Sequence, residues 1–96
     1  MYLAVTDVKP LEKYKLHLTF ENNDKRIFDV NPYLNIGRFS ELRDISLFNS
    51  VKVSFDSVEW SNHLDLDPEL LYEKSKPLSD YFEAADVFEA PSFENA

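Results

Sequence analysis

Residues 14–30 have the sequence YKLHLTFENNDKRIFDV, and this stretch decides the fold of the chain. Hydrophobic residues at positions 14, 16, 18 and 20 alternate with polar ones, which is the period-two pattern of a strand with one buried face. The Asn-Asn-Asp sequence at 22–24 tolerates the left-handed backbone of tight turns. Residues 25–30 then supply a return strand, so the stretch predicts a β-hairpin.

Shorter strands are expected on both sides of this hairpin. A first strand begins at Leu3 and is expected to stop near Pro10, because proline cannot donate a hydrogen bond to a neighbouring strand. Val51, Val53 and Phe55 alternate with polar residues and predict another strand. Asp56-Ser57 is expected to form a turn, after which residues 58–60 pair back.

A helical segment is expected between these two groups of strands. Hydrophobic residues recur there at every third position, at Phe39, Leu42, Ile45 and Phe48. This spacing predicts two short helical pieces that bury one side. Asp44 precedes the second piece and is expected to cap it, because aspartate accepts hydrogen bonds from the first free backbone amides of a helix.

Two further features complete the expected fold. Gly37 is the only glycine and is expected at a bend with positive φ. Asp67-Pro68-Glu69 is typical of a helix start, and that helix is expected to end by Pro77. The sequence thus predicts an α+β fold: an antiparallel sheet of about five short strands, two or three short helices and an acidic C-terminal tail.

The composition changes at the end of the chain, which predicts two parts. Residues 1–76 form the expected domain and carry 13 acidic and 10 basic residues, a charge of −3. Residues 77–96 carry five acidic residues and no Lys or Arg, a charge of −5. Tyr81, Phe82, Ala85 and Phe88 would share one face of a helix, since positions three and four apart meet. We expect them to be candidate partner-binding residues.

The overall composition excludes several classes of protein. The net charge is −8 and no basic cluster appears, so direct binding of nucleic acid is not expected. No apolar stretch approaches the roughly 20 residues that cross a membrane, and the first residues do not resemble a signal peptide. The chain contains no cysteine, which fits a reducing compartment. We therefore expect a cytoplasmic protein without a membrane segment.

Catalytic and cofactor sites are not apparent in the sequence. His17 occupies a polar position of a strand and is expected to be exposed. His63, Asp65 and Asp67 alternate and could face one metal ion, but a helix cap and a solvated edge explain them better. Trp60 and His63 could line a ligand pocket, although a lone tryptophan at a strand end is more often part of the core. We expect no catalytic residues, no metal and no cofactor.

Six ordered motifs resemble those of a known bacterial family. They are residues 7–11 (DVKPL), 16–21 (LHLTFE), 28–30 (FDV), 39–44 (FSELRD), 47–48 (LF) and 59–60 (EW) followed by 65–72 (DLDPELLY). Over residues 1 to about 76, the chain resembles the family called domain of unknown function 2442. The resemblance implies an α+β fold and a regulatory or protein-binding role. Some members of the family are encoded beside another small protein, an arrangement similar to a toxin–antitoxin pair. The resemblance implies no catalytic residues.

These observations predict a non-enzymatic interaction or regulatory module that binds another small protein, and the family resemblance suggests an antitoxin-like role. Exposed strand edges also make a homodimer plausible. An alternative from another class stays open at this point. It is a small-molecule-binding protein or weak enzyme with a pocket near Trp60 and His63.

Overall fold

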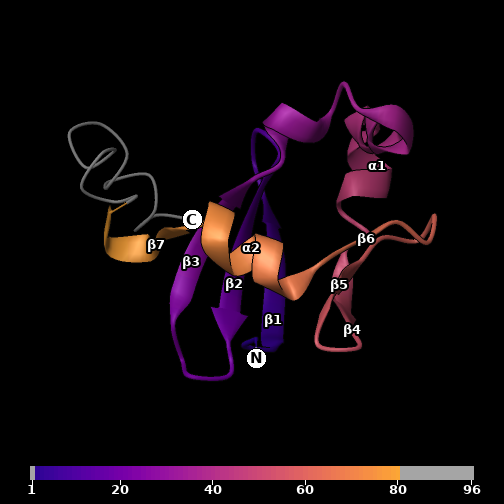
Figure 1. Ribbon diagram of the computed structural model, residues 1–96. Coiled ribbons are helices and arrows are strands. Elements are labelled where there is room, and N and C mark those ends of the chain that lie inside the picture. Colours follow the sequence, from indigo (N-terminus) through magenta and orange to yellow (C-terminus); the bar gives the residue numbers. More distant parts are fainter. Residues whose placement is uncertain (1, 81–96) are drawn as a thin grey trace.

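The hairpin of residues 14–30 lies in the middle of a four-stranded antiparallel sheet (Figure 1). The computed structural model describes residues 2–80. In spatial order the strands are β1 (Val5–Leu11), β2 (Lys15–Phe20), β3 (Lys25–Asp29) and β7 (Lys76–Pro77). Leu16 lies opposite Phe28 in the register of β2 and β3. Asn23 has a φ of 68°, so the left-handed turn predicted for residues 22–24 is confirmed.

A second antiparallel sheet of three short strands lies beside the first (Figure 1). Its strands are β4 (Lys52–Ser54), β5 (Ser57–Glu59) and β6 (Asp65–Leu66). The two sheets are joined where the Val5 amide of β1 donates a hydrogen bond to the Asp56 carbonyl over 2.9 Å. The α+β class and the antiparallel pairing are confirmed, and the strands are divided between two sheets.

The first strand begins at Val5, two residues later than predicted. β1 continues through Pro10, which lies opposite Leu16, and ends at Leu11. The expectation that the strand stops near Pro10 is therefore confirmed to within one residue. Pro10 is accommodated inside the strand because β1 is an edge strand, where a residue without an amide hydrogen can point its nitrogen away from the neighbouring strand.

The helical segment between the sheets has a period of three because much of it is 3₁₀ helix. The described helices are η1 (Asn31–Tyr33), η2 (Gly37–Arg43), α1 (Ile45–Phe48) and α2 (Pro68–Lys74). Leu42 and Phe48 are buried, as predicted, but the side chain of Ile45 is 55% exposed. Ile45 is the first residue of α1, so it lies where the chain changes from one helix to the next. Gly37 has a φ of +49°, as predicted.

The two predicted helix caps differ in the structure. The Asp44 carboxylate accepts hydrogen bonds from the amides of Ser46 and Leu47, so the predicted cap of α1 is confirmed. Asp67 occupies the N-cap position of α2, and Pro68 follows at the first helical position. However, the Asp67 side chain makes no capping hydrogen bond.

One hydrophobic cluster joins both sheets and the helices. It contains Leu16, Leu18, Phe20 and Phe28 from the hairpin, Phe48 from α1, Val58 and Leu66 from the second sheet, Trp60, and Leu71 from α2. α2 crosses the face of the first sheet that carries these hairpin residues (Figure 1). The ring of Tyr72 in α2 meets Phe20 edge to face at 4.9 Å, a favourable arrangement of aromatic rings.

The end of the described chain is also part of the first sheet. Lys76 and Pro77 form β7 and lie opposite Ile27 and Arg26 of β3. The boundary expected near Pro77 between a domain and a tail stays a prediction, since most of the tail lies outside the described residues. No helix within residues 2–80 is long and apolar enough to cross a membrane.

The contrast between the two caps predicts different losses of stability. Asp44→Ala removes two hydrogen bonds to helix amides and should lower the free energy of unfolding by about 1 kcal/mol. Asp67→Ala, the matched control, removes no such bond and should lower it less. Urea denaturation of both variants measures the difference, and equal losses would contradict this account of the caps.

Candidate partner-binding site

The turn between β4 and β5 exposes a large aromatic side chain. Phe55 and Asp56 form this turn and have φ values of 49° and 71°. Left-handed backbone at both central residues is the geometry of a mirror-image hairpin turn, which favours Asn and Gly. The side chain of Phe55 is nevertheless 98% exposed. The expectation that Phe55 belongs to the strand and that the turn is Asp56-Ser57 is wrong, because the pairing of Ser54 with Ser57 leaves only Phe55 and Asp56 between the strands.

A hollow of about 430 Å³ lies beside this turn. Its walls come from β4, the turn, β5, β6 and the start of α2. The lining residues, which we call the hairpin surface, are Ser54, Phe55, Ser57, Glu59, Asp65, Leu66, Asp67 and Pro68. An aromatic ring, two aliphatic side chains and three carboxylates thus gather at one place.

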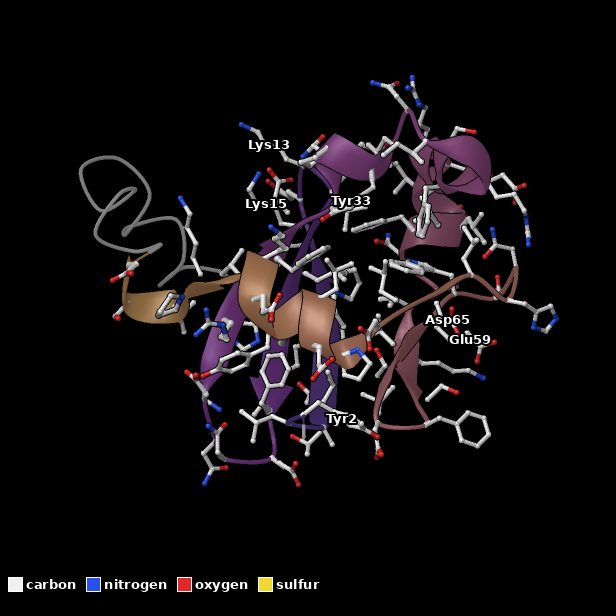
Figure 2. All side chains as sticks on the ribbon, viewed as in Figure 1. Tyr2, Lys13, Lys15, Tyr33, Glu59 and Asp65 are labelled. Carbon is white, nitrogen blue, oxygen red and sulfur yellow. The ribbon has the colours of Figure 1, made fainter. Side chains whose placement is uncertain are left out.

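The carboxylates of the hairpin surface are close to one another. Glu59 of β5 and Asp65 of β6 lie directly opposite in the register, and Figure 2 shows their side chains next to each other. Like charges in this position destabilise a sheet. The Nδ1 atom of His63 lies 3.5 Å from Glu59, which would be an ion pair only with a protonated imidazole. On β4, the other neighbour of β5, Lys52 lies opposite Glu59. A cationic group of a partner would therefore relieve repulsion between Glu59 and Asp65.

The structure separates the two residues of the predicted ligand pocket. Trp60 is only 1% exposed, and its indole nitrogen donates a hydrogen bond to the Phe48 carbonyl over 3.0 Å. The side chain of His63 is 88% exposed and lies in the following turn. Neither residue lines the hollow. Trp60 thus belongs to the core, and the hollow lies on neighbouring residues instead.

The candidate metal ligands are also dispersed. Asp65 and Asp67 line the hollow, whereas His63 projects beyond it next to Glu59. Within residues 2–80 no group of three or more His, Asp or Glu side chains is placed to hold a metal ion. The described part of the chain therefore gives no support to a metal centre at these positions.

His17 is partly buried rather than exposed, which corrects the expectation from its place in the strand pattern. Burial lowers the pKa of His17, and the positive charges of Lys25 and Lys9 lower it further, against the opposing charge of Asp7. Its Nδ1 atom is buried without a hydrogen-bond partner among the described residues. A base needs a partner within hydrogen-bonding reach to be activated, so His17 shows no catalytic arrangement here.

The remaining predicted site residues are in the tail. Tyr81, Phe82, Ala85 and Phe88 lie outside the described residues, so their role in partner binding stays a prediction. Sequence reasoning did not place Phe55 or Glu59 in a candidate site, and it considered Asp65 only as a metal ligand. A signal was available for Phe55: a two-residue turn at 55–56 places Val53 opposite Val58, and these two valines do pair.

The backbone of Phe55 predicts an effect on stability. Asparagine adopts left-handed backbone more readily than phenylalanine, and the exposed ring of Phe55 makes little contact. Phe55→Asn should therefore raise the free energy of unfolding by about 0.5–2 kcal/mol, the usual range for substitutions that suit a local backbone. Lys13→Asn, at another exposed position with positive φ, is the matched control and should also stabilise. Chemical denaturation measures the stability of both variants. A loss of stability in Phe55→Asn would contradict the backbone strain inferred at this position.

The lowered pKa of His17 predicts a dependence of stability on pH. Below its usual pKa of about 6.5, His17 binds a proton more readily in the unfolded chain than in the folded one. The contribution of His17 to the free energy of unfolding is therefore present above about pH 6.5 and is lost as the pH falls toward the folded-state pKa. Wild-type protein should lose more stability than His17→Gln between about pH 7 and pH 5. Urea denaturation across this range tests the prediction, which parallel profiles would contradict.

Comparison with known proteins places the chain in a family. A family model with the description "protein of unknown function (DUF2442)" matches residues 5–77. The match runs from the start of β1 to the end of β7 and so includes both sheets and the described helices. A search of curated proteins and a search of solved structures gave no match. The resemblance inferred from the ordered motifs is confirmed, and the chain belongs to the DUF2442 family of proteins of unknown function.

Proposed function

We propose that this protein is a non-enzymatic interaction module that binds another small protein through the hairpin surface. The observation that carries the proposal is the side chain of Phe55, which is 98% exposed at the tip of a strained turn. Non-glycine residues with left-handed backbone cost free energy and are concentrated at functional sites. Aromatic residues, phenylalanine among them, are also enriched at protein interfaces.

The chemistry of the hairpin surface supports a basic partner. Phe55 and the partly exposed Pro68 provide apolar contact area beside the carboxylates of Glu59, Asp65 and Asp67, whereas Leu66 also lines the hollow but is only 8% exposed. A partner segment with an apolar side chain flanked by Lys or Arg would match both properties. The acidic groups would orient the encounter and speed it. The ring of Phe55, once the partner buries it, would contribute most of the affinity.

The alternative function, a small-molecule site or weak enzyme near Trp60 and His63, has less support. The indole of Trp60 is engaged in the core, and His63 projects into solvent. The chain has only two histidines. Nδ1 of His17 has no hydrogen-bond partner among the described residues, and His63 lies beside Glu59 but its side chain is 88% exposed. These observations favour binding over catalysis.

Narrower proposals concern the setting of this interaction. The family resemblance supports a regulatory, antitoxin-like role with a partner encoded nearby, and the cysteine-free composition supports the cytoplasm. The tail residues Tyr81, Phe82, Ala85 and Phe88 form a second candidate contact. A homodimer through a strand edge is a further possibility that the experiment below distinguishes.

Site-specific photocrosslinking tests the proposal. A photoreactive phenylalanine analogue, p-benzoylphenylalanine, replaces Phe55 in one variant and Lys13 in the matched control, since both residues lie in exposed hairpin turns. Irradiation of the producing cells should give a discrete covalent adduct from position 55 but not from position 13. Mass spectrometry should assign the crosslinked peptide to a protein segment that carries Lys or Arg beside an apolar residue.

Charge substitutions make the test specific. Glu59→Gln combined with Asp65→Asn should greatly reduce the adduct at position 55, because the repulsion that a basic segment relieves is then absent. No discrete adduct, or the same adducts from positions 55 and 13, would refute the hairpin surface as the binding site. An adduct between two copies of the chain would replace the small-protein partner with a homodimer.

A further inference from the structure

The face of the first sheet that points away from the core carries a row of residues across all four strands. Lys9 of β1 lies opposite His17 of β2, which lies opposite Ile27 of β3, which lies opposite Lys76 of β7. Directly opposed residues point to the same side of a sheet, and so do residues two apart in one strand. Lys15 and Lys25 therefore share this side. We call these six residues the lysine face.

The lysine face is a basic surface on an acidic protein. Its four lysines share this side of the sheet with two carboxylates, Asp7 and Asp29, as the register shows. Lys15 lies 3.8 Å from Asp29, whereas Lys9, Lys25 and Lys76 are exposed and make no ion pair with another described residue. The net charge of the whole chain is −8. An acidic segment would therefore be attracted to this face and repelled by most of the remaining surface.

The centre of the lysine face is largely shielded from water. Ile27 is 5% exposed but does not belong to the hydrophobic cluster, to which α1, α2 and the second sheet contribute their buried residues. The adjacent Nδ1 atom of His17 is buried and has no hydrogen-bond partner among the described residues. The stems of the lysines cover part of such a centre. An apolar segment lying across the face would complete the cover.

Residues 81–96 have the matching chemistry and start from the right place. They carry Glu83, Asp86, Glu89 and Glu94 but no Lys or Arg, and four of them are aromatic. They follow closely after β7, which is the edge of the lysine face. Sixteen residues reach up to roughly 50 Å when extended, while four paired strands are about 15 Å across. The segment is therefore long enough to cross the whole sheet.

We propose that residues 81–96 bind in cis to the lysine face, with their aromatic side chains over Ile27 and their carboxylates near Lys9, Lys25 and Lys76. This interaction lies beyond the proposed function, which uses the hairpin surface. The lysine face is then an intramolecular binding site for the chain's own acidic segment. This interaction also means that a partner which captures Tyr81, Phe82 and Phe88 must first displace them from the sheet.

Paramagnetic relaxation in the full chain tests the proposal. The sequence contains no cysteine, so Ser92→Cys provides a single site for a nitroxide label in the segment. The label should enhance transverse relaxation of the Lys9 and His17 amides several-fold more than that of Leu71 in α2 or Val53 in β4. Raising the ionic strength from about 0.01 M to about 1 M shortens the Debye length from about 30 Å to about 3 Å and should reduce the enhancement.

Charge-reversal variants of the labelled chain supply the matched comparison. Lys9→Glu/Lys25→Glu/Lys76→Glu should abolish the selective enhancement at His17 and Ile27. Lys13→Glu/Lys52→Glu/Lys74→Glu has the same change in net charge at exposed lysines elsewhere and should retain it. The amide spectrum of each variant reports directly whether it is folded.

Three results would overturn the proposal. The first is a uniform or absent enhancement over the lysine face in the labelled chain. The second is an equal effect of the two triple variants. The third is relaxation enhancement of the ¹⁵N chain in a mixture of labelled, isotope-free chain and unlabelled ¹⁵N chain. Such enhancement would show that the segment of one copy binds the lysine face of a second copy.

Discussion

Burial of one face of the β2–β3 hairpin is the interaction on which the rest of the structure depends. Leu16, Leu18, Phe20 and Phe28 are almost completely excluded from water. In so small a domain, a few aromatic and aliphatic side chains provide most of the hydrophobic stabilisation. The other elements are arranged around this face. α2 adds the ring of Tyr72, which also lies under the Arg26 guanidinium at 4.2 Å.

The same constraint decides which surfaces are free for binding. Because the helices and the second sheet pack on one side of the hairpin, the opposite side of the first sheet keeps its lysines at the surface. The second sheet likewise buries Val58 and Leu66 and leaves Glu59 and Asp65 outside. Two outer faces of opposite charge result from one buried cluster. In the two proposals above, the acidic face is the site for a partner and the basic face is the site for the chain's own acidic segment.

Local chemistry made several features predictable. The alternation in residues 14–20 and the Asn-rich turn predicted the central hairpin, because a strand with one buried face requires that alternation. The cap at Asp44 and the bend at Gly37 depend on a few neighbouring atoms, so sequence alone was sufficient for both. The spacing of three between Phe39 and Phe48 indicated helices. Leu42 lies inside the 3₁₀ helix η2 and is buried, whereas Ile45 is the first residue of the following α-helix and is exposed at this junction.

By itself, the sequence determined the α+β class, the central hairpin, the family and the acidic character of the chain. Only the tertiary structure decided the placements of residues that depend on neighbouring strands and helices. Pro10 is accommodated because β1 is an edge strand, and Trp60 is unavailable to a ligand because its indole donates to Phe48. Phe55 is exposed because the register of β4 and β5 places it in the turn. Such placements depend on contacts between residues distant in sequence, which periodicity and local propensity do not encode.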